Sequence, residues 1–334
     1  MKEHSKLITE QAIEMVKDVF ASQLKKQLKL IQVSSPIAIL DGMGINDDLN
    51  GIERPVRFPV KALNEKQAVV VHSLAKWKRL RLKQLEIPVG SGILTDMRAL
   101  RPDEDYSSIH SVYVDQWDWE MHLSPEDRTL DKLKQTVKSI YQVLRETEIE
   151  VSKKWGIEPT LPQSIHFLHS EELQQQYPTD KVKMRENKIA KKHGAVFIMG
   201  IGGKLSNGEK HDGRAPDYDD WSTTNSDGFQ GLNGDLIVWN PELEQAFELS
   251  SMGIRVDSSA LKVQLIESSS EERTQLQFHQ QLLSNQLPQS IGGGIGQSRV
   301  CMFLLKKRHI GEVQIGIWDE ELVNELATKG IELL

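Results

Sequence analysis

The sequence has 334 residues, which is enough for one large domain or two ordinary ones. Hydrophobic residues make up 38% and charged residues 27% of the chain, proportions typical of a water-soluble globular protein. The formal net charge of -7 argues against a nucleic-acid-binding protein whose affinity depends on neutralising phosphates. The single cysteine, Cys301, excludes an intrachain disulfide and a zinc site built from cysteines.

The N-terminal residues are charged and lack the apolar core of a signal peptide. No apolar stretch reaches the roughly 18 residues that a membrane-spanning helix needs. We therefore expect a cytoplasmic protein that does not act in a membrane.

The first half of the chain predicts helices and strands in alternation. Apolar residues spaced three and four apart predict a long amphipathic helix over residues 6–28. A strand-like run over 30–40 follows, and Pro36 places it at a sheet edge or an interface, because proline cannot donate a ladder hydrogen bond. Further along, the pattern predicts strands over 67–73, 92–100 and 110–120, a basic helix over 75–86, and a long helix beginning at Ser124 and Pro125 and ending near Gly156.

The second half predicts one strand and two short helices within residues 164–193, and then a functional loop region rich in glycine and aspartate over 194–233. The pattern then predicts two or three antiparallel strands over 235–257, helices over 258–265 and 270–285, a glycine turn at 291–299 with its helix, a strand at 312–318 and a last helix at 319–329. Strands joined by short turns, with helices elsewhere, favour an antiparallel sheet flanked by helices. We therefore predict an α+β fold and a single domain over residues 1–334.

The glycine-rich segment at residues 291–299 is the most informative stretch for function. Its four glycines let the backbone approach a flat or charged ligand, and Arg299 adds a fixed positive charge beside them. A phosphate-binding P-loop would need Lys and then Ser or Thr where Gln297 and Ser298 stand, and a dinucleotide fingerprint would need glycine at position 299. We interpret the segment as an arginine-bearing glycine turn of another kind, shaped for a nucleotide.

The predicted strand at 110–120 carries a polar face. Alternate residues of a strand share a face, so Gln116 and Asp118 point one way while Tyr113, Trp117 and Trp119 point the other way into apolar packing. The alternating aromatics favour a buried polar pocket over a wet surface. A carboxylate can pair with an ammonium group, and an amide both donates and accepts, so this face suits a zwitterionic ligand.

A second constellation lies in the hairpin expected to turn at Pro241 and Glu242. Symmetric pairing about that turn would set Asp235 directly across from Glu248, where like charges repel. A cation between the two carboxylates would remove the repulsion, and oxygen ligands suit Mg²⁺. A one-residue shift in the turn would instead place the two side chains on different faces, so the spacing alone leaves both interpretations open.

Two arginines stand at the ends of predicted elements, Arg101 after a strand and Arg299 after the glycine turn. A planar guanidinium binds phosphate in a bidentate way and keeps its charge. With a carboxylate pair nearby, the two would hold a nucleoside triphosphate and its magnesium, although most isolated arginines are solvated surface groups. Residues 210–221 fit no metal-ligand template, and we interpret them as a loop that closes over a polar ligand.

Taken together, these segments resemble the ammonia-dependent asparagine synthetase A family, the aspartate–ammonia ligases, over nearly the whole chain. The resemblance is carried by residues 71–79, 99–105, 110–120, 214–221, 231–240, 247–256 and 291–299. It implies the catalytic-domain fold of class II aminoacyl-tRNA synthetases, which has three signatures. They are matched by the N-terminal helix with Pro36 at a dimer interface, by Arg101 and by Arg299. The resemblance therefore also implies a homodimer.

The reaction that the resemblance implies has two steps and uses L-aspartate, ATP and ammonia. The β-carboxylate of aspartate attacks the α-phosphate of ATP, which gives β-aspartyl-adenylate and pyrophosphate. Ammonia then attacks the activated carbonyl, AMP leaves, and L-asparagine is formed. Because adenylation brings two anions into contact, fixed cations and Mg²⁺ must offset their repulsion.

The resemblance also implies roles for particular residues. It implies that Asp235 and Glu248 hold Mg²⁺, and we expect Asp47 to bind ammonium and accept its proton. The implied catalytic residues are Asp47, Arg101 and Gln116. The implied aspartate-binding residues are Ser73, Lys78, Gln116, Asp118, Asp219 and Arg255. The implied ATP-binding residues are Arg101, Ile109, His110, Val114, Gly294, Ile295 and Arg299.

Three alternative functions make different demands on the sequence. An aminoacyl-tRNA synthetase would need an anticodon-binding domain, for which the segment before Pro36 is too short, and the net charge opposes tRNA binding. A non-catalytic sensor of asparagine or AMP should have lost the predicted arginines or carboxylates, and all of them are present. A glutamine-dependent synthetase would need an N-terminal cysteine nucleophile, so we expect free ammonia as the nitrogen source and no nucleic-acid partner.

Overall fold

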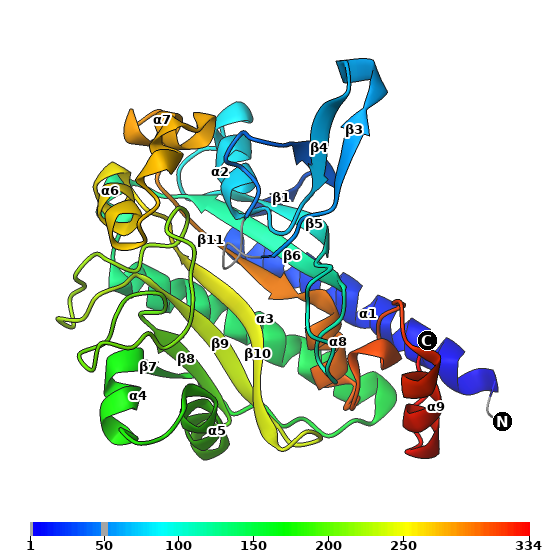
Figure 1. The fold of residues 1–334 in the computed structure, drawn as a ribbon. Coiled ribbons are helices and arrows are strands. Elements are labelled where there is room, and N and C mark those ends of the chain that lie inside the picture. The colour runs from blue at the N-terminus through cyan, green and yellow to red at the C-terminus, as the bar shows by residue number, and fades with distance from the viewer. Residues whose placement is uncertain (1–2, 48–52) are drawn as a thin grey trace.

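The computed structural model describes residues 3–47 and 53–334, which form helices around a large sheet (Figure 1). Within these ranges no helix combines the length and the apolar character needed to cross a membrane.

The main sheet has eight strands within the described residues. In spatial order they are β1 (Leu30–Gln32), β5 (Gly92–Leu100), β6 (Tyr113–His122), β11 (Ser290–Gly296), β10 (Gln245–Ile254), β9 (Asn233–Asn240), β8 (Ala195–Met199) and β7 (His166–His169). Neighbouring strands run antiparallel except at the two edges, where β1 is parallel to β5 and β7 is parallel to β8. This arrangement confirms the predicted α+β fold with a largely antiparallel sheet flanked by helices.

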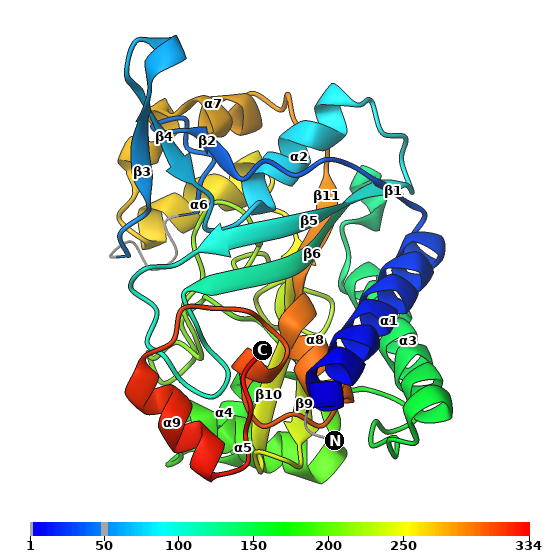
Figure 2. The same cartoon turned by 90° about the vertical axis from the view of Figure 1, so that its right-hand side faces the viewer.

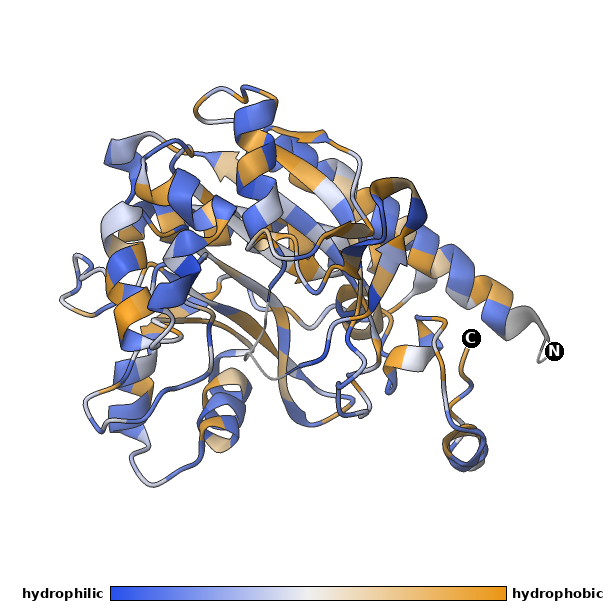
Figure 3. Ribbon diagram, turned by 45° about the horizontal axis from the view of Figure 1, so that its top comes forward, coloured by the Kyte–Doolittle hydropathy of each residue, from blue (hydrophilic) through white to orange (hydrophobic). Residues whose placement is uncertain are grey.

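Two long helices, α1 (Glu3–Leu28) and α3 (Leu130–Trp155), lie side by side on one face of this sheet, next to α8 (Gln297–Leu304) (Figure 2). Hydrophobic and hydrophilic bands alternate along the helices, because their apolar side chains turn to the core (Figure 3). Phe20 of α1 stacks on Trp117 of β6, with 4.3 Å between the ring centroids. Cys301 of α8 is fully buried in the same core, and burial raises the pKa of its thiol to about 12.

Shorter elements surround the opposite face of the sheet. The remaining described helices are α2 (Ala75–Gln84), α4 (Ser170–Gln176), α5 (Val182–His193), α6 (Ser258–Glu267), α7 (Gln277–Leu283) and α9 (Glu320–Thr328). Short 3-10 helices are η1 (Lys61–Leu63), η2 (Pro125–Asp127), η3 (Glu271–Gln275) and η4 (Ile310–Glu312). A small sheet in the order β2 (Ala38–Leu40), β4 (Lys66–Val70) and β3 (Arg57–Val60) projects at the top of the view in Figure 1.

Several predicted boundaries were wrong. The run over residues 30–40 is two strands, β1 and β2, which belong to different sheets. Ser124 and Pro125 begin η2 and not the long helix, whereas α3 starts after Thr129, whose hydroxyl caps it. Gly156 ends α3 as predicted, with a left-handed φ of 68° that suits glycine.

Other segments also differ from the prediction. The loop predicted over 194–233 begins with β8, whose five residues are all buried, and a buried strand lacks the alternation that marks a half-exposed one. Residues 312–318 form no strand, because η4 and an irregular segment occupy that place. The strand predicted over 67–73 ends at Val70, and the strand predicted from 110 begins at Tyr113.

The prediction of a glycine turn was wrong, since Ser290–Gly296 form strand β11 in the middle of the main sheet. Its glycines leave room for side chains from the neighbouring strands. A Cβ on Gly292 would lie 1.8 Å from Glu120 Oε2, and one on Gly294 would lie 2.3 Å from Gln116 Oε1. The glycines therefore let two polar side chains of β6 lie across the backbone of β11.

Candidate active site

A cavity of about 770 Å³ opens over the sheet on the face opposite α1 and α3. Strands β6, β10 and β11, helix α2 and the loops around residues 101–111 and 212–219 contribute to its walls. The predicted site residues that line it are Asp47, Ser73, Lys78, Arg101, Ile109, His110, Val114, Gln116, Asp118, Asp219, Glu248, Arg255, Gly294 and Arg299. The structure thus brings together residues that are spread over most of the sequence.

Two predicted site residues do not line this cavity. Ile295 is buried in the apolar core on the other face of β11, because neighbouring residues of a strand alternate between faces. Asp235 is buried, and Arg214, which lines the cavity, pairs with it. Asp47 is buried and lines the cavity, whereas residues 48–52, which follow it, lie outside the described part of the chain.

The predicted pairing of Asp235 directly across from Glu248 is wrong. In the β9–β10 ladder Asp235 pairs with Ser251, and Glu248 pairs with Ile237, with an irregularity between Glu248 and Ser250. The connection is longer than a turn at 241–242, because the ladder closes with Asn240 opposite Gln245. Positions 235 and 237 share a face, so the two carboxylates remain on one side of the sheet as diagonal neighbours.

Charged residues in one part of the cavity are already paired with each other. Lys78 Nζ donates to Asp118 and, at 2.8 Å, to the carbonyl oxygen of Gly293. Both side chains are almost completely buried, and Asp118 Oδ2 has no hydrogen-bond partner within the described residues. Burial lowers the pKa of Lys78, which the charge of Asp118 partly offsets. This ion pair therefore presents one cation and one anion to a ligand.

Arg255 forms a second buried ion-pair group. Its Nε and Nη2 atoms donate to both oxygens of Glu120, at 2.8–3.2 Å, and its Nη1 donates to Asp219. Burial opposes the charge, but the two carboxylates outweigh burial and raise the pKa of Arg255. Ser290 Oγ donates to Glu120 Oε1 at 2.7 Å, which fixes the carboxylate from its other side. The guanidinium thus keeps one orientation against the cavity.

Arg299 stands where β11 gives way to α8. Its guanidinium donates to the carbonyl oxygen of Glu248 at 3.1 Å and to His110 Nε2 at 3.0 Å. The other ring nitrogen of His110 lies 2.9 Å from Ser107 Oγ. Burial, with the charge of Arg299, lowers the pKa of His110 to about 4. The histidine is therefore neutral near pH 7 and can accept a hydrogen bond from the arginine.

This contact predicts a specific loss of stability in acid. Because the pKa of His110 is lowered in the folded state, only the unfolded chain binds the extra proton as pH falls from about 6.5 to about 4. His110→Gln keeps a hydrogen-bond acceptor without a titratable ring. Between pH 6.5 and pH 4.5 we expect the wild-type protein to lose about 1–2 kcal/mol more unfolding free energy than the variant in urea titrations. Parallel stability curves for the two proteins would contradict this.

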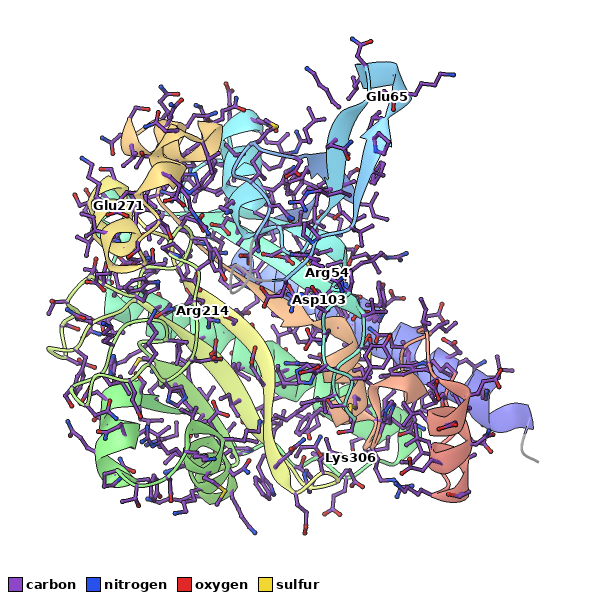
Figure 4. All side chains as sticks on the ribbon, in the orientation of Figure 1. Arg54, Glu65, Asp103, Arg214, Glu271 and Lys306 are labelled. Carbon is purple, nitrogen blue, oxygen red and sulfur yellow. The ribbon has the colours of Figure 1, made fainter. Side chains whose placement is uncertain are left out.

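Arg101 directly follows β5 and lines the cavity. The loop that it begins is held in place by a contact between Asp103 and Arg54. Arg101 Nη2 donates to the carbonyl oxygen of His72 at 3.3 Å, and its Nε has no hydrogen-bond partner within the described residues. The backbone nitrogen of Arg54 donates to Asp103 at 2.7 Å, and Figure 4 shows these two residues meeting beside the loop. A fixed guanidinium with an unused donor suits an anionic ligand.

Two residues that the sequence analysis missed belong to the site. Glu120 is on the same face of β6 as Gln116 and Asp118, so extending the alternation by two residues would have found it. Arg214, labelled in Figure 4, lines the cavity and pairs with Asp235, while its Nε lies 3.6 Å from Asp219. It lies in an irregular loop, where no periodicity points to it.

The sheet, its flanking helices, the arginine after β5 and the arginine in the first turn of α8 define the class II aminoacyl-tRNA synthetase catalytic fold. An asparaginyl-tRNA synthetase from Pyrococcus horikoshii, solved as a complex with asparaginyl-adenylate, matches with a TM-score of 0.67 and 14% identity over 92% of this chain and 68% of that chain. An aspartyl-tRNA synthetase from Entamoeba histolytica matches with a TM-score of 0.63 and 14% identity over 94% of this chain and 59% of that chain. These matches confirm the predicted fold class.

Sequence relatives then give the family. Residues 7–330 match the family model described as aspartate–ammonia ligase. A protein of Parabacteroides distasonis named aspartate–ammonia ligase is 56% identical over 98% of this chain and 95% of its own length. A protein of the same name from Bacteroides fragilis is 54% identical with the same coverage. The chain belongs to the aspartate–ammonia ligase family, as its sequence motifs predicted.

Proposed function

We propose that this protein is a cytoplasmic ligase that makes L-asparagine from L-aspartate and ammonia, using ATP and releasing AMP and pyrophosphate. The observation that carries the proposal is one cavity with two kinds of charged group. Arg101 and Arg299 offer cations to phosphates, and the Lys78–Asp118 pair offers a cation and an anion to a zwitterion. Family membership supports the same reaction.

In the first step an oxygen of the β-carboxylate bonds to the α-phosphorus of ATP, and the bond from that phosphorus to pyrophosphate breaks. Lys78 and Arg255 hold the carboxylates, while Asp118 and Asp219 bind the ammonium group, together with Ser73 and Gln116. Arg101 stabilises the charge that develops on the α-phosphate. This division of roles is supported by the charges that line the cavity.

ATP binds in the part of the cavity lined by His110 and Arg299. The guanidinium of Arg299 covers the adenine and reaches the phosphates, while Ile109 and Val114 supply apolar contacts and Gly294 leaves the ring room. The neutral His110 fixes the arginine without adding a competing charge. The cost of orienting Arg299 is therefore met before ATP binds.

In the second step the nitrogen of ammonia bonds to the activated β-carbonyl carbon, and the bond from that carbon to the AMP oxygen breaks. Asp47 holds the incoming ammonium and accepts its proton. A carboxylate is a weak base in water, and Asp47, whose exposed fraction is 3%, is largely shielded from water where it lines the cavity. Asp47 takes this proton before the nitrogen attacks, because ammonium has no lone pair with which to form the carbon–nitrogen bond, and the nitrogen releases a second proton to water as AMP leaves.

A magnesium ion would be held by Asp235 and Glu248 together with phosphate oxygens of ATP. The two residues supply only oxygen ligands, and no group of three or more candidate metal ligands gathers in the described residues, so phosphates would complete the shell. Burial, with repulsion from Glu248, raises the pKa of Asp235, although Arg214 opposes the rise. A divalent cation held by these two carboxylates would relieve that repulsion and would supply positive charge to the phosphates.

We also propose that the whole chain acts as one catalytic domain within a homodimer. Ile31 on the edge strand β1 is 52% exposed, and Leu7 on α1 is 60% exposed, which leaves apolar side chains and an unpaired strand edge available to a second copy. Light scattering of the purified protein tests this. A monomeric mass across the micromolar range would contradict it.

One assay tests the proposed reaction. The protein is incubated with aspartate, ATP and Mg²⁺, and with either ammonium or glutamine as the nitrogen source. We expect asparagine, AMP and pyrophosphate in equal amounts with ammonium, and only background levels with glutamine. ADP and phosphate as products would contradict the proposal, because they would show that the carboxylate attacks the γ-phosphate and not the α-phosphate.

A further inference from the structure

A completely buried carboxylate, Asp217, ties together elements that surround the cavity. One of its oxygens, Oδ2, accepts from Lys76 Nζ, from Arg273 Nη1 and from His279 Nε2, each at 3.0 Å. Lys76 belongs to α2, Arg273 to η3 and His279 to α7. We call these four residues the Asp217 group. Lys76 and Asp217 lie within the motif segments 71–79 and 214–221, but no member of the group was assigned a site role, and none has a role in the reaction steps above.

The Asp217 group acts as one electrostatic unit. Asp217 and His279 have no exposed surface, and Lys76 is 2% exposed. Burial alone would raise the pKa of Asp217, but Lys76, His279 and Arg273 outweigh it and hold the pKa far below its usual range. Loss of one donor leaves the buried carboxylate less well compensated, because burial penalises its charge. The three donors therefore hold their elements firmly around Asp217.

Two members of the group, Lys76 and Asp217, are close in sequence to residues that are proposed to bind aspartate. Lys76 is two residues before Lys78 in α2, and Lys78 pairs with Asp118. Asp217 is two positions before Asp219, which pairs with Arg255. The backbone of this loop is held as well, since Val256 N donates to the carbonyl oxygen of the intervening residue at 2.9 Å. A shift of Asp217 would thus move Asp219 against Lys78.

The third arm reaches the segment that carries Asp47. Phe278 N of α7 donates to the carbonyl oxygen of Met43 at 3.4 Å. A Cβ on Gly44 would lie 3.0 Å from His279 Nδ1, so the backbone at Gly44 passes directly against the histidine ring. Helix α7 also packs on α2 through a shared apolar cluster that contains Phe278. The same four residues therefore locate three segments of the amino-acid pocket relative to one another.

We propose that Asp217 is a positioning residue for L-aspartate, which sets the spacing between Lys78, Asp219 and Asp47. The inference rests on the proposed function and names a determinant of it. ATP is held by Arg101 and Arg299, whose hydrogen bonds within the described residues are with His72, His110 and Glu248 and not with the Asp217 group. Loosening the group therefore weakens aspartate use while ATP use is largely kept.

The test uses variants that remove one arm at a time. Lys76→Met removes the arm to α2, and His279→Ala removes the arm to α7, while two donors to Asp217 remain in each case. His279→Gln keeps an N–H donor at that place. Glu148→Gln is the matched control, because Glu148 is also a buried carboxylate that accepts several hydrogen bonds, from residues 160 and 161, but lies on α3 behind the sheet.

Aspartate-dependent exchange of labelled pyrophosphate into ATP gives KM for each substrate. The two variants should bind aspartate less well, because Lys78 and Asp219 lose their set spacing. We expect Lys76→Met and His279→Ala to raise KM for aspartate about tenfold or more, with KM for ATP changed less than about threefold. His279→Gln should recover most of the aspartate affinity. Glu148→Gln should lower the thermal midpoint without changing either KM, which separates positioning from general stability.

Two results would overturn the inference. One is an unchanged KM for aspartate in both Lys76→Met and His279→Ala, and the other is an equal rise in KM for both substrates. The wild-type protein decides the underlying function separately. If the wild-type protein shows no aspartate-dependent exchange, the proposed reaction is wrong. If the wild-type protein shows normal exchange and the variants keep its KM for aspartate, only the role of Asp217 is wrong.

Discussion

Arg101→Ala is expected to reduce aspartate-dependent pyrophosphate exchange by roughly 10²–10³-fold, the cost of removing a preorganised donor to a developing charge. The side chain points into the cavity with an Nε donor that no described residue uses, so its charge is available to the α-phosphate. The measurement is the exchange rate at saturating ATP and aspartate. Arg308→Ala is the control, since Arg308 is exposed and donates to the carbonyl oxygen of Lys329 instead.

Asp47→Asn separates the two half-reactions that Arg101→Ala should lose together. If Asp47 takes the proton from ammonium, the amide variant still forms the adenylate but makes asparagine slowly. Exchange should then stay within about tenfold of wild type while amidation falls by roughly 10²–10⁴-fold, the usual range for a lost general base. Equal losses in both half-reactions would show that Asp47 has another role.

Lys78→Met is expected to have the largest effect on both stability and activity. It leaves Asp118 charged and almost completely buried without its cation, which typically costs about 3–5 kcal/mol of unfolding free energy. It also removes a cation that is proposed to bind aspartate, so exchange should fall to background. Urea unfolding and the exchange assay measure the two effects on one preparation.

The double variant Lys78→Met, Asp118→Leu distinguishes these effects. Replacing both charges by apolar groups of similar size removes the unpaired carboxylate, so most of the lost stability should return. Activity should not return, because the cation and the anion for aspartate are both absent. Lys329→Met, which breaks an exposed ion pair with Glu325, should leave stability almost unchanged. Recovery of exchange in the double variant would contradict a role for the pair in binding.

The sequence predicted those parts of the site that depend on local pattern. Strand alternation placed Gln116 and Asp118 on the cavity face, and Trp117 and Trp119 in the core. The alternation was followed only as far as Asp118, so the next residue on the same face, Glu120, was missed. Family motifs located Arg101 after a strand and Arg299 after the glycine-rich segment, and both line the cavity.

What the sequence could not predict depends on contacts between distant segments. The glycines of β11 suggested a turn, because glycine is common in turns and nothing local shows that Glu120 and Gln116 occupy the missing Cβ positions. The predicted pairing of Asp235 with Glu248 was wrong because the connection between β9 and β10 is longer than a two-residue turn and β10 carries an irregularity. Arg214 lies in an irregular loop, and only the folded chain shows which carboxylate it meets.

The burial of the sole cysteine gives the protein its own reporter of unfolding. Cys301 has no exposed surface, and burial raises the pKa of its thiol to about 12, so the reactive thiolate is nearly absent while the core is closed. A thiol reagent should therefore label the chain only when the core around α8 opens. The labelling rate of each variant then measures how often that opening occurs under native conditions, with no engineered cysteine and no second thiol in the sequence.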